Sequence, residues 1–244
     1  MSTAPVFLVD ALPESDKTVL DGDEGRHAAT VRRLGAGAEV QLSDGVGGLA
    51  ECSVIAAGEG RLELAVVGRR RLDPPQPRLI VVQALPKGDR GELAVELMTE
   101  LGVDVIVPWA AARCVMQWRG DRGEKSLRKW RSSARAAAKQ SRRAWVPEVS
   151  DPASTRQVCS MISAARAGVV LHESARRPLP ALDFPGNGDV VLVVGPEGGL
   201  TEGEVTAFRA AGARTARLGP TVLRTSTAGA AALAVLGPIT ARWS

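Results

Sequence analysis

The sequence is poor in the residues that build metal sites and disulfide frameworks. Its 244 residues include three cysteines and two histidines. Cys52, Cys114 and Cys159 lie far apart without C-x-x-C spacing, and neither histidine has cysteine or acidic partners at ligand spacing. We therefore predict no metal and no disulfide. The cysteines are expected to act as small apolar side chains in a reducing compartment.

Long apolar runs are also missing. No stretch reaches eighteen uninterrupted apolar residues, so no membrane-spanning helix and no membrane partner is predicted. The first ten residues lack the basic segment, apolar segment and cleavage site of a secretory signal. We therefore expect a cytoplasmic location.

Positive charge is present, and it is concentrated in one segment. The whole chain has a formal net charge of +4, whereas residues 113–143 hold eleven lysines and arginines against two acids. This segment therefore carries +9, and the remainder of the chain carries −5. A basic region on an acidic body is typical of a protein that binds a polyanion.

The first seventy residues have the pattern of a small β domain. Short β-prone runs at 40–42, 50–55 and 62–67 are separated by glycine-containing turn signals. Short strands at this spacing predict a small barrel.

A proline-rich segment then interrupts the pattern. Residues 69–77 read Arg-Arg-Arg-Leu-Asp-Pro-Pro-Gln-Pro, and three prolines in four positions favour a stiff, extended connector. We therefore predict a first domain at 1–70, a linker at 71–77 and a second domain at 78–244.

The second domain alternates between strand and helix patterns, which predicts an α/β fold with a largely parallel sheet. Gly102 is expected to follow the first helix in the C-cap position, and Pro108 to stop the second strand. The predicted strands cover 79–84, 103–107, 169–171, 190–194 and 215–218. The predicted helices cover 89–101, 124–143, 155–166, 202–211 and 226–236.

Two glycine-containing segments near the C-terminus are candidates for a ligand site. At 190–204 an apolar strand runs into Gly-Pro-Glu-Gly-Gly-Leu and then into a helix, for which Thr201 and Glu204 have capping-box spacing. Such a loop falls at the carboxyl end of a strand, where open α/β sheets bind ligands, and glycines let a ligand approach the backbone closely. Taken alone, the same loop is compatible with an ordinary tight turn.

The second segment, 218–230, repeats this logic with a Gly-Pro turn before a helix. Thr225 or Ser226 is expected to cap that helix, and the small residues of its first turns allow close packing. Arg224 precedes it and offers fixed donors to a carboxylate or phosphate. Pairing of Arg224 with a surface acid is an equal alternative.

Together these motifs resemble the RsmE family of the SPOUT class of methyltransferases. The pattern Gly-Pro-Glu-Gly-Gly-Leu-Thr-x-x-Glu is followed about twenty residues later by Leu-Gly-x-x-x-Leu-Arg-Thr-x-Thr-Ala. The resemblance extends over nearly the whole chain. Its further segments are 87–90, 99–103, 106–108, Arg113, Lys129-Trp130, 138–143, Val146-Pro147, and, in the first domain, His27, Val31-Arg32-Arg33 and Gly37.

The resemblance implies a PUA-like β-barrel followed by a SPOUT α/β domain with a trefoil knot, and a homodimer. It implies that S-adenosylmethionine donates a methyl group to N3 of a uridine in 16S ribosomal RNA of the small subunit. Ser226 departs from the family, which usually has an acid there. The residues implied to bind the donor are Leu171, His172, Val194, Gly195, Pro196, Glu197, Gly198, Gly199, Leu218, Gly219, Leu223, Arg224, Thr225 and Ala228.

The basic segment supplies the predicted RNA surface. Within the predicted helix, five cations share one face, while Leu127, Trp130, Ala134 and Ala137 form an apolar stripe. Because acids are scarce along that face, phosphate binding is favoured over intrahelical ion pairs. Arg69–Arg71 in the linker would extend this surface. The predicted RNA-binding residues are Arg32, Arg33, Arg113, Arg128, Arg131, Arg135, Lys139, Arg142 and Arg143.

For catalysis, Arg224 is expected to stabilise negative charge on the target base, and Glu197 to act as a base or to hold its loop. Two other functions remain open. One is a different SPOUT methyltransferase, acting on another base or on transfer RNA. The other is a non-catalytic RNA-binding protein of ribosome assembly, which would need only the basic face.

Overall fold

A computed structural model describes residues 4–243 and divides the chain into two compact units. The first unit comprises the chain up to Pro74 together with Ala138–Val146. The second comprises Pro75–Ala137 and the chain from Pro147 onward. Neither unit is therefore a single continuous stretch of sequence.

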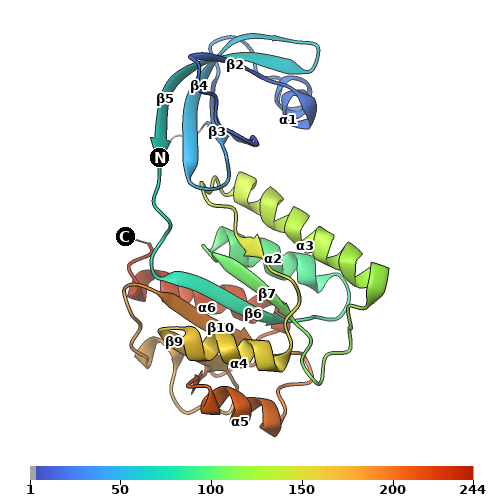
Figure 1. Cartoon of the computed structure of the whole chain (residues 1–244), viewed down its shortest axis with the longest axis vertical. Coiled ribbons are helices and arrows are strands. Elements are labelled where there is room, and N and C mark those ends of the chain that lie inside the picture. Colours follow the sequence, from blue (N-terminus) through green and yellow to red (C-terminus); the bar gives the residue numbers. More distant parts are fainter. Residues whose placement is uncertain (1–3, 244) are drawn as a thin grey trace. The chain divides into compact units, whose positions relative to one another are not determined.

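The first unit is a five-stranded sheet with the order β1-β3-β4-β5-β2 (Figure 1). β1 is parallel to β3, and the other neighbours are antiparallel. The side chains of Phe7, Leu42, Leu62 and Leu64 are fully buried in its core. The elements are β1 (Val6–Leu8), β2 (Lys17–Leu20), α1 (Gly22–Arg26), the π-helical turn η1 (His27–Val31), β3 (Glu39–Ser43), β4 (Gly48–Gly58) and β5 (Arg61–Arg71).

β4 and β5 form a long hairpin joined by a tight turn of two residues. Glu59 and Gly60 both have positive φ, at 49° and 74°, and Gly58 pairs with Arg61. β5 continues through Arg71, so the prediction that Arg69–Arg71 belong to the linker is wrong. β1, β2, α1 and η1 were not predicted.

The segment 138–146 belongs to the first unit through backbone bonds to the β3–β4 turn. The amide of Gly47 donates to the carbonyl of Ala144 at 2.9 Å, and the amide of Val146 donates to Gly45 at 2.9 Å. Lys139, in the same segment, forms an ion pair with Glu24.

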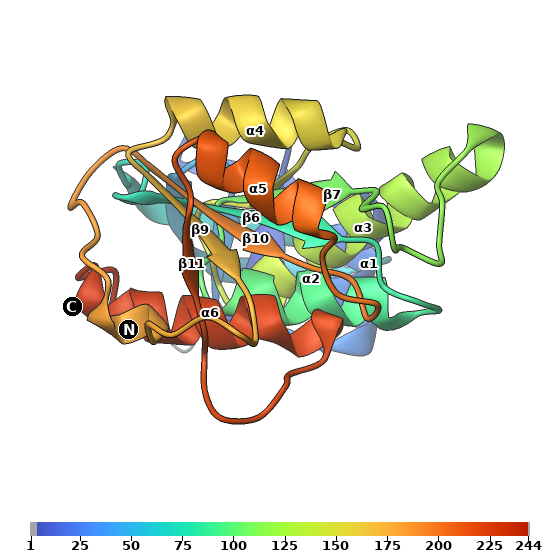
Figure 2. The ribbon, with the colours of Figure 1, turned by 90° about the horizontal axis from the view of Figure 1, so that it is seen from below.

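The second unit is built on a six-stranded parallel sheet with the order β11-β9-β10-β6-β7-β8. Helices α4 and α5 cover one face, and α2 and α6 cover the other (Figure 2). The strands are β6 (Arg78–Ala84), β7 (Val105–Trp109), β8 (Glu148–Val149), β9 (Ala167–Leu171), β10 (Asp189–Val194) and β11 (Arg214–Ala216). The helices are α2 (Arg90–Glu100), α3 (Gly120–Gln140), α4 (Thr155–Ala164), the 3-10 turn η2 (Leu179–Ala181), α5 (Glu202–Ala210) and α6 (Thr225–Ile239).

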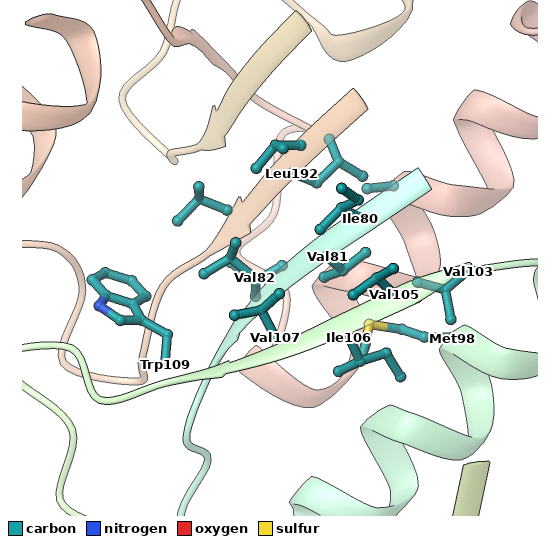
Figure 3. Close-up of a cluster of buried hydrophobic side chains, with 14 of the residues drawn as sticks. Ile80, Val81, Val82, Met98, Val103, Val105, Ile106, Val107, Trp109 and Leu192 are labelled. Atoms are coloured by element: carbon teal, nitrogen blue, oxygen red, sulfur yellow. The ribbon is translucent and has the colours of Figure 1, made fainter. Parts of the chain in front are cut away.

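The central strands are apolar at almost every position because helices cover both of their faces. Figure 3 shows the side chains of β6, β7 and β10, with Met98 of α2 against them. α6 approaches α2 closely at Gly229, where an added Cβ would lie 2.6 Å from Sδ of Met98. The small residues of α6 therefore permit close packing, as predicted.

Two predicted boundaries were wrong for identifiable reasons. Pro108 lies inside β7 and does not stop it. Its carbonyl accepts a hydrogen bond from Ala153 on the side away from β6, so the missing N–H costs no bond to β6. α3 begins at Gly120 and ends at Gln140, and Arg142 beyond it has a left-handed φ of 58°. Among residues 4–243, no helix is long and apolar enough to cross a membrane.

Candidate functional site

A cavity of about 520 Å³ lies at the carboxyl ends of β9, β10 and β11. Its walls are the residues that follow these three strands, including the long loop between β11 and α6 (Figure 2). Every residue that the sequence assigned to the methyl donor lines this cavity, and the remaining lining residues are Arg113, Glu173, Leu200, Arg217, Thr221 and Val222. The structure therefore brings the two glycine-containing segments together.

The loop after β10 depends on its glycines. Gly199 has a φ of 71°, which is costly for any residue with a Cβ, and its amide donates to Pro196 at 2.9 Å. α5 then begins with the predicted capping box: the Thr201 hydroxyl accepts from the Glu204 amide, and the Glu204 carboxylate accepts from the Thr201 amide. This prediction is confirmed. The capping box thus fixes the end of the loop that lines the cavity.

The side chain of Arg113 holds this loop through a hydrogen bond to its backbone. Its Nη1 donates to the carbonyl of Gly198 at 3.1 Å, and an added Cβ on Gly198 would lie 3.2 Å from Cβ of Arg113. Next to it, the amide of Ala112 donates to Oε1 of buried Glu204 at 2.8 Å. The sequence assigned Arg113 to RNA, whereas the structure places it in the wall of the cavity.

Glu197 lies at the tip of the same loop. Its Oε1 accepts a hydrogen bond from the amide of Lys87 at 3.1 Å. This bond ties the loop after β10 to the loop after β6. Of the two roles considered for Glu197, this contact favours holding the loop.

The start of α6 differs from the prediction. Arg224 is the N-cap residue and makes no capping bond with its side chain, so Thr225 or Ser226 as the cap was wrong. Thr225 and Ser226 lie inside the helix and are buried. The carbonyl of Arg224 accepts from the amides of Thr227 at 2.9 Å and Ala228 at 3.0 Å. Nε2 of Gln83 in β6 donates to the carbonyl of Thr225 at 3.2 Å and so joins the first turn of α6 to the sheet. Sequence reasoning missed Gln83, although it is the single polar residue in the run 79–84.

The charge of Arg224 is not neutralised locally. Within residues 4–243 no carboxylate lies within 4.0 Å of its guanidinium, so pairing with a surface acid was the wrong alternative. Ser226 is buried and does not line the cavity. His172 lies on the rim, where its Nδ1 is 2.9 Å from the hydroxyl of Ser174.

Comparisons with known proteins agree on one family. The model of an RNA methyltransferase domain matches residues 73–237, and that of an RNA methyltransferase PUA domain matches residues 20–67. Ribosomal RNA small subunit methyltransferase E of Mycobacterium tuberculosis is 49% identical, with 98% of this chain and 94% of that protein covered.

The chain belongs to the RNA methyltransferase family that includes ribosomal RNA small subunit methyltransferase E.

The similarity to more distant members also covers nearly the whole chain. The enzyme of Bacillus subtilis with that name is 29% identical over 92% of this chain and 91% of its own length. The structure of ribosomal RNA small subunit methyltransferase E from Neisseria gonorrhoeae, bound to S-adenosyl methionine, superposes with a TM-score of 0.83. It is 26% identical, with 97% of this chain and 98% of that chain covered. The fold is therefore the SPOUT α/β fold with an N-terminal PUA-like domain.

Only some of the cations on the predicted RNA-binding surface are available to bind phosphate, because others are paired with acids. As predicted, Leu127, Trp130, Ala134 and Ala137 are buried. Ion pairs within the helix were not expected on the opposite face, yet one is present, and two further cations pair with acids outside the helix. Arg128 pairs with Glu124 at 3.6 Å, Arg131 with Asp151 at 3.0 Å, and Lys139 with Glu24.

The remaining predicted RNA-binding residues are scattered. Arg135 is exposed on α3, and Arg142 and Arg143 follow that helix. Arg32 and Arg33 are exposed after η1 in the first unit. The structure therefore does not gather the predicted set on one continuous helical face.

No cysteine of the site is arranged as a nucleophile. Burial raises the pKa of the Cys114 thiol above its ordinary value, and the nearby carboxylates of Glu197 and Glu204 add to this. Among the described residues, no group of three His, Cys, Asp or Glu side chains could hold a metal ion.

Proposed function

We propose that this protein transfers the methyl group of S-adenosylmethionine to N3 of a uridine in the 16S RNA of the small ribosomal subunit. The observation that carries the proposal is the single cavity formed by the loops after β9, β10 and β11. It is supported by membership of a family whose named relatives methylate small-subunit ribosomal RNA. We expect the reaction to take place in the cytoplasm.

The cavity has the size and surface that such a donor needs. Its volume of about 520 Å³ lies within the range of about 300–1,000 Å³ typical of small-molecule sites. Three glycines (Gly195, Gly198 and Gly199) expose backbone groups along one wall, and Leu218 and Leu223 supply apolar surface along another. Such a wall can bind the polar edges and the flat ring of an adenosine.

When bound there, S-adenosylmethionine supplies a methyl group already activated by its sulfonium. The protein then has to align the uridine with that methyl group and exclude water. The uridine N3 must lose its proton, and the negative charge spreads to the flanking carbonyl oxygens. The guanidinium of Arg224, which no carboxylate neutralises within the described residues, can stabilise that charge.

Two further properties belong to the proposal. By its family likeness the segment after β11 threads through a trefoil knot, and the active protein is a homodimer. Both follow from the SPOUT resemblance. Sedimentation velocity of the purified protein tests the dimer directly.

Titration with S-adenosylmethionine, followed by a methyl-transfer assay on small-subunit ribosomal RNA, tests the function. We expect saturable donor binding and methylation of one uridine. N3 lies on the base-pairing edge, so the product stops reverse transcription one nucleotide before the modified base.

Three outcomes would contradict the proposal. Folded protein that binds no donor at millimolar concentration would exclude the enzyme. A stop only in transfer RNA, or methylation at another base position, would assign the protein to the different SPOUT activity.

A further inference from the structure

A second hollow adjoins the donor cavity. It has a volume of about 860 Å³ and lies between α5 and the residues after β9, over the edge strand β11. His172 and Leu200 line both hollows, so a chain bound in one can continue into the other.

The second hollow is strongly basic. Arg176, Arg177, Arg209 and Arg214 line it, against the single acid Glu202. Within residues 4–243, no carboxylate lies within 4.0 Å of any of these four guanidinium groups. The cations of α3 differ, because most of those predicted to bind RNA are paired with acids. Four arginines without an acidic partner in the described chain therefore lie together beside the donor cavity.

Three of these arginines are oriented by neutral oxygens. Arg177 donates to the carbonyl of Ala181 at 3.3 Å, Arg209 to the hydroxyl of Thr215 at 3.2 Å, and Arg214 to the carbonyl of Asp183 at 2.8 Å. Each of these three bonds uses Nη2 alone, and a guanidinium has five N–H donors. The side chains are thus held in place while their charge and further donors remain available.

The chemistry of the hollow favours phosphate groups. Guanidinium groups bind phosphate oxygens in pairs of parallel hydrogen bonds, and RNA presents a phosphate at every nucleotide. A second copy of this chain on the β11 edge is disfavoured, because a symmetric contact would bring the same arginines against each other. Charge complementarity therefore identifies RNA as the occupant.

We propose that the second hollow binds the sugar–phosphate backbone of the substrate RNA next to the target nucleotide, through Arg176, Arg177 and Arg209. This inference rests on the proposed function. It assigns RNA positioning to the residues beside the donor cavity, in addition to any contribution from Arg135 on α3.

The test compares two double variants of the full chain. Arg176→Gln with Arg209→Gln removes two charges from the hollow. Arg156→Gln with Arg166→Gln is the matched control, since both arginines are exposed, have no acid within 4.0 Å in the described chain and lie outside the hollow. The probe is an in vitro transcript of bacterial small-subunit ribosomal RNA, with binding measured at several salt concentrations.

The hollow variant is expected to bind the transcript about tenfold or more weakly at low salt. Its plot of log affinity against log salt is expected to be shallower by about 1 to 2, because each phosphate contact contributes roughly 0.7–0.9 to the slope. Donor affinity and thermal unfolding should match the wild type. The control loses the same net charge as the hollow variant. Its RNA affinity and its salt slope should nevertheless stay close to those of the wild type.

The two proposals fail separately. If the wild type neither binds S-adenosylmethionine nor methylates the transcript, the proposed function is wrong. If the wild type methylates the transcript but the hollow variant and the control have equal RNA affinity and slope, the hollow does not bind RNA. A hollow variant that changes its sedimentation behaviour with unchanged RNA binding would overturn the inference in favour of a second copy.

Discussion

Individual residues of the donor loop contribute through backbone conformation more than through side-chain chemistry. The positive φ of Gly199 shapes the turn after β10, and Arg113 and Glu197 act on backbone groups of that turn and of the loop after β6. Most of the recognisable motif therefore specifies the shape of a loop.

Gly199→Ala is expected to weaken donor binding. The space around an added Cβ is open, with Arg113 Nη1 at 4.0 Å, so the cost is the left-handed backbone itself, about 1–2 kcal/mol. S-adenosylmethionine affinity measured by titration should fall by about five- to tenfold or more. Gly203→Ala is the control, because Gly203 lies inside α5 with nothing within 4 Å. Equal donor affinity in the two variants would show that the turn is not constrained.

Glu197→Gln is expected to retain most activity. A carboxamide oxygen can still accept from the Lys87 amide, so the loop stays in place. Glu197→Ala removes that acceptor and should raise the KM for the donor. A general base contributes about 10²–10⁴-fold to the rate, so a loss of 100-fold in kcat in the Gln variant would establish Glu197 as the base.

At the scale of elements, the central strands and their helices were predictable from the sequence. The apolar run at 190–194, and the run at 79–84 with Gln83 as its one polar residue, indicate strands buried on both faces, and Thr201 with Glu204 marks the start of α5. The short strands β1, β2 and β8 were not predictable, because two to four residues carry too little periodicity. The predicted cap of α6 was wrong because the helix begins one residue earlier than the hydroxyl residues suggest, with Arg224 as the N-cap and its carbonyl accepting from the amides of Thr227 and Ala228.

Thr201→Ala is expected to destabilise the second unit by about 1 kcal/mol, since it removes an N-cap hydroxyl. Thr206→Ala, at an exposed position inside α5, replaces a poor helix former by a good one and should be neutral or slightly stabilising. Urea unfolding of both variants measures the difference. An unchanged midpoint for Thr201→Ala would show that the box adds nothing to stability.

The candidate site itself could be predicted from the sequence only as separate segments. Glycine, proline and threonine at 195–201 and 219–227 indicate loops before helices, but strand order decides which loops meet. The roles of Arg113 and Gln83 depend on contacts across 85 and 142 residues of chain, which no local pattern encodes. The pairing of Arg131 with Asp151 and of Lys139 with Glu24 was missed for the same reason.

At the scale of the whole molecule, the end of the chain is fastened to the sheet by a buried ion pair. Arg242 donates to Asp104 at 2.6 and 3.0 Å and to the carbonyls of Pro77 and Gly102. Asp104 in turn accepts from the amide of Leu79 at the start of β6. One cluster thus joins the C-terminus to the first strands of the second unit.

Arg242→Ala is expected to destabilise the protein by about 3–5 kcal/mol, because it leaves the carboxylate of Asp104 buried without its partner. Arg78→Ala is the control. It breaks exposed pairs with Glu148 and Asp189, and such pairs are worth about 0–1 kcal/mol each. The free energy of unfolding in urea measures both, and similar losses in the two variants would contradict the role given to burial.

The discontinuous first unit has a consequence for synthesis. Because Ala138–Val146 completes it, the unit cannot form all of its contacts until residue 146 has emerged from the translating ribosome. By then β6 and β7 have emerged as well, while β10, the other neighbour of β6, is still to be made. The edge of β6 therefore stays unpaired until β10, more than a hundred residues downstream, has been made. Synthesis proceeds at about 5–20 residues per second. A gene cut at the proline-rich segment would encode a first fragment that lacks Ala138–Val146, and a second fragment that carries those residues without the sheet they complete.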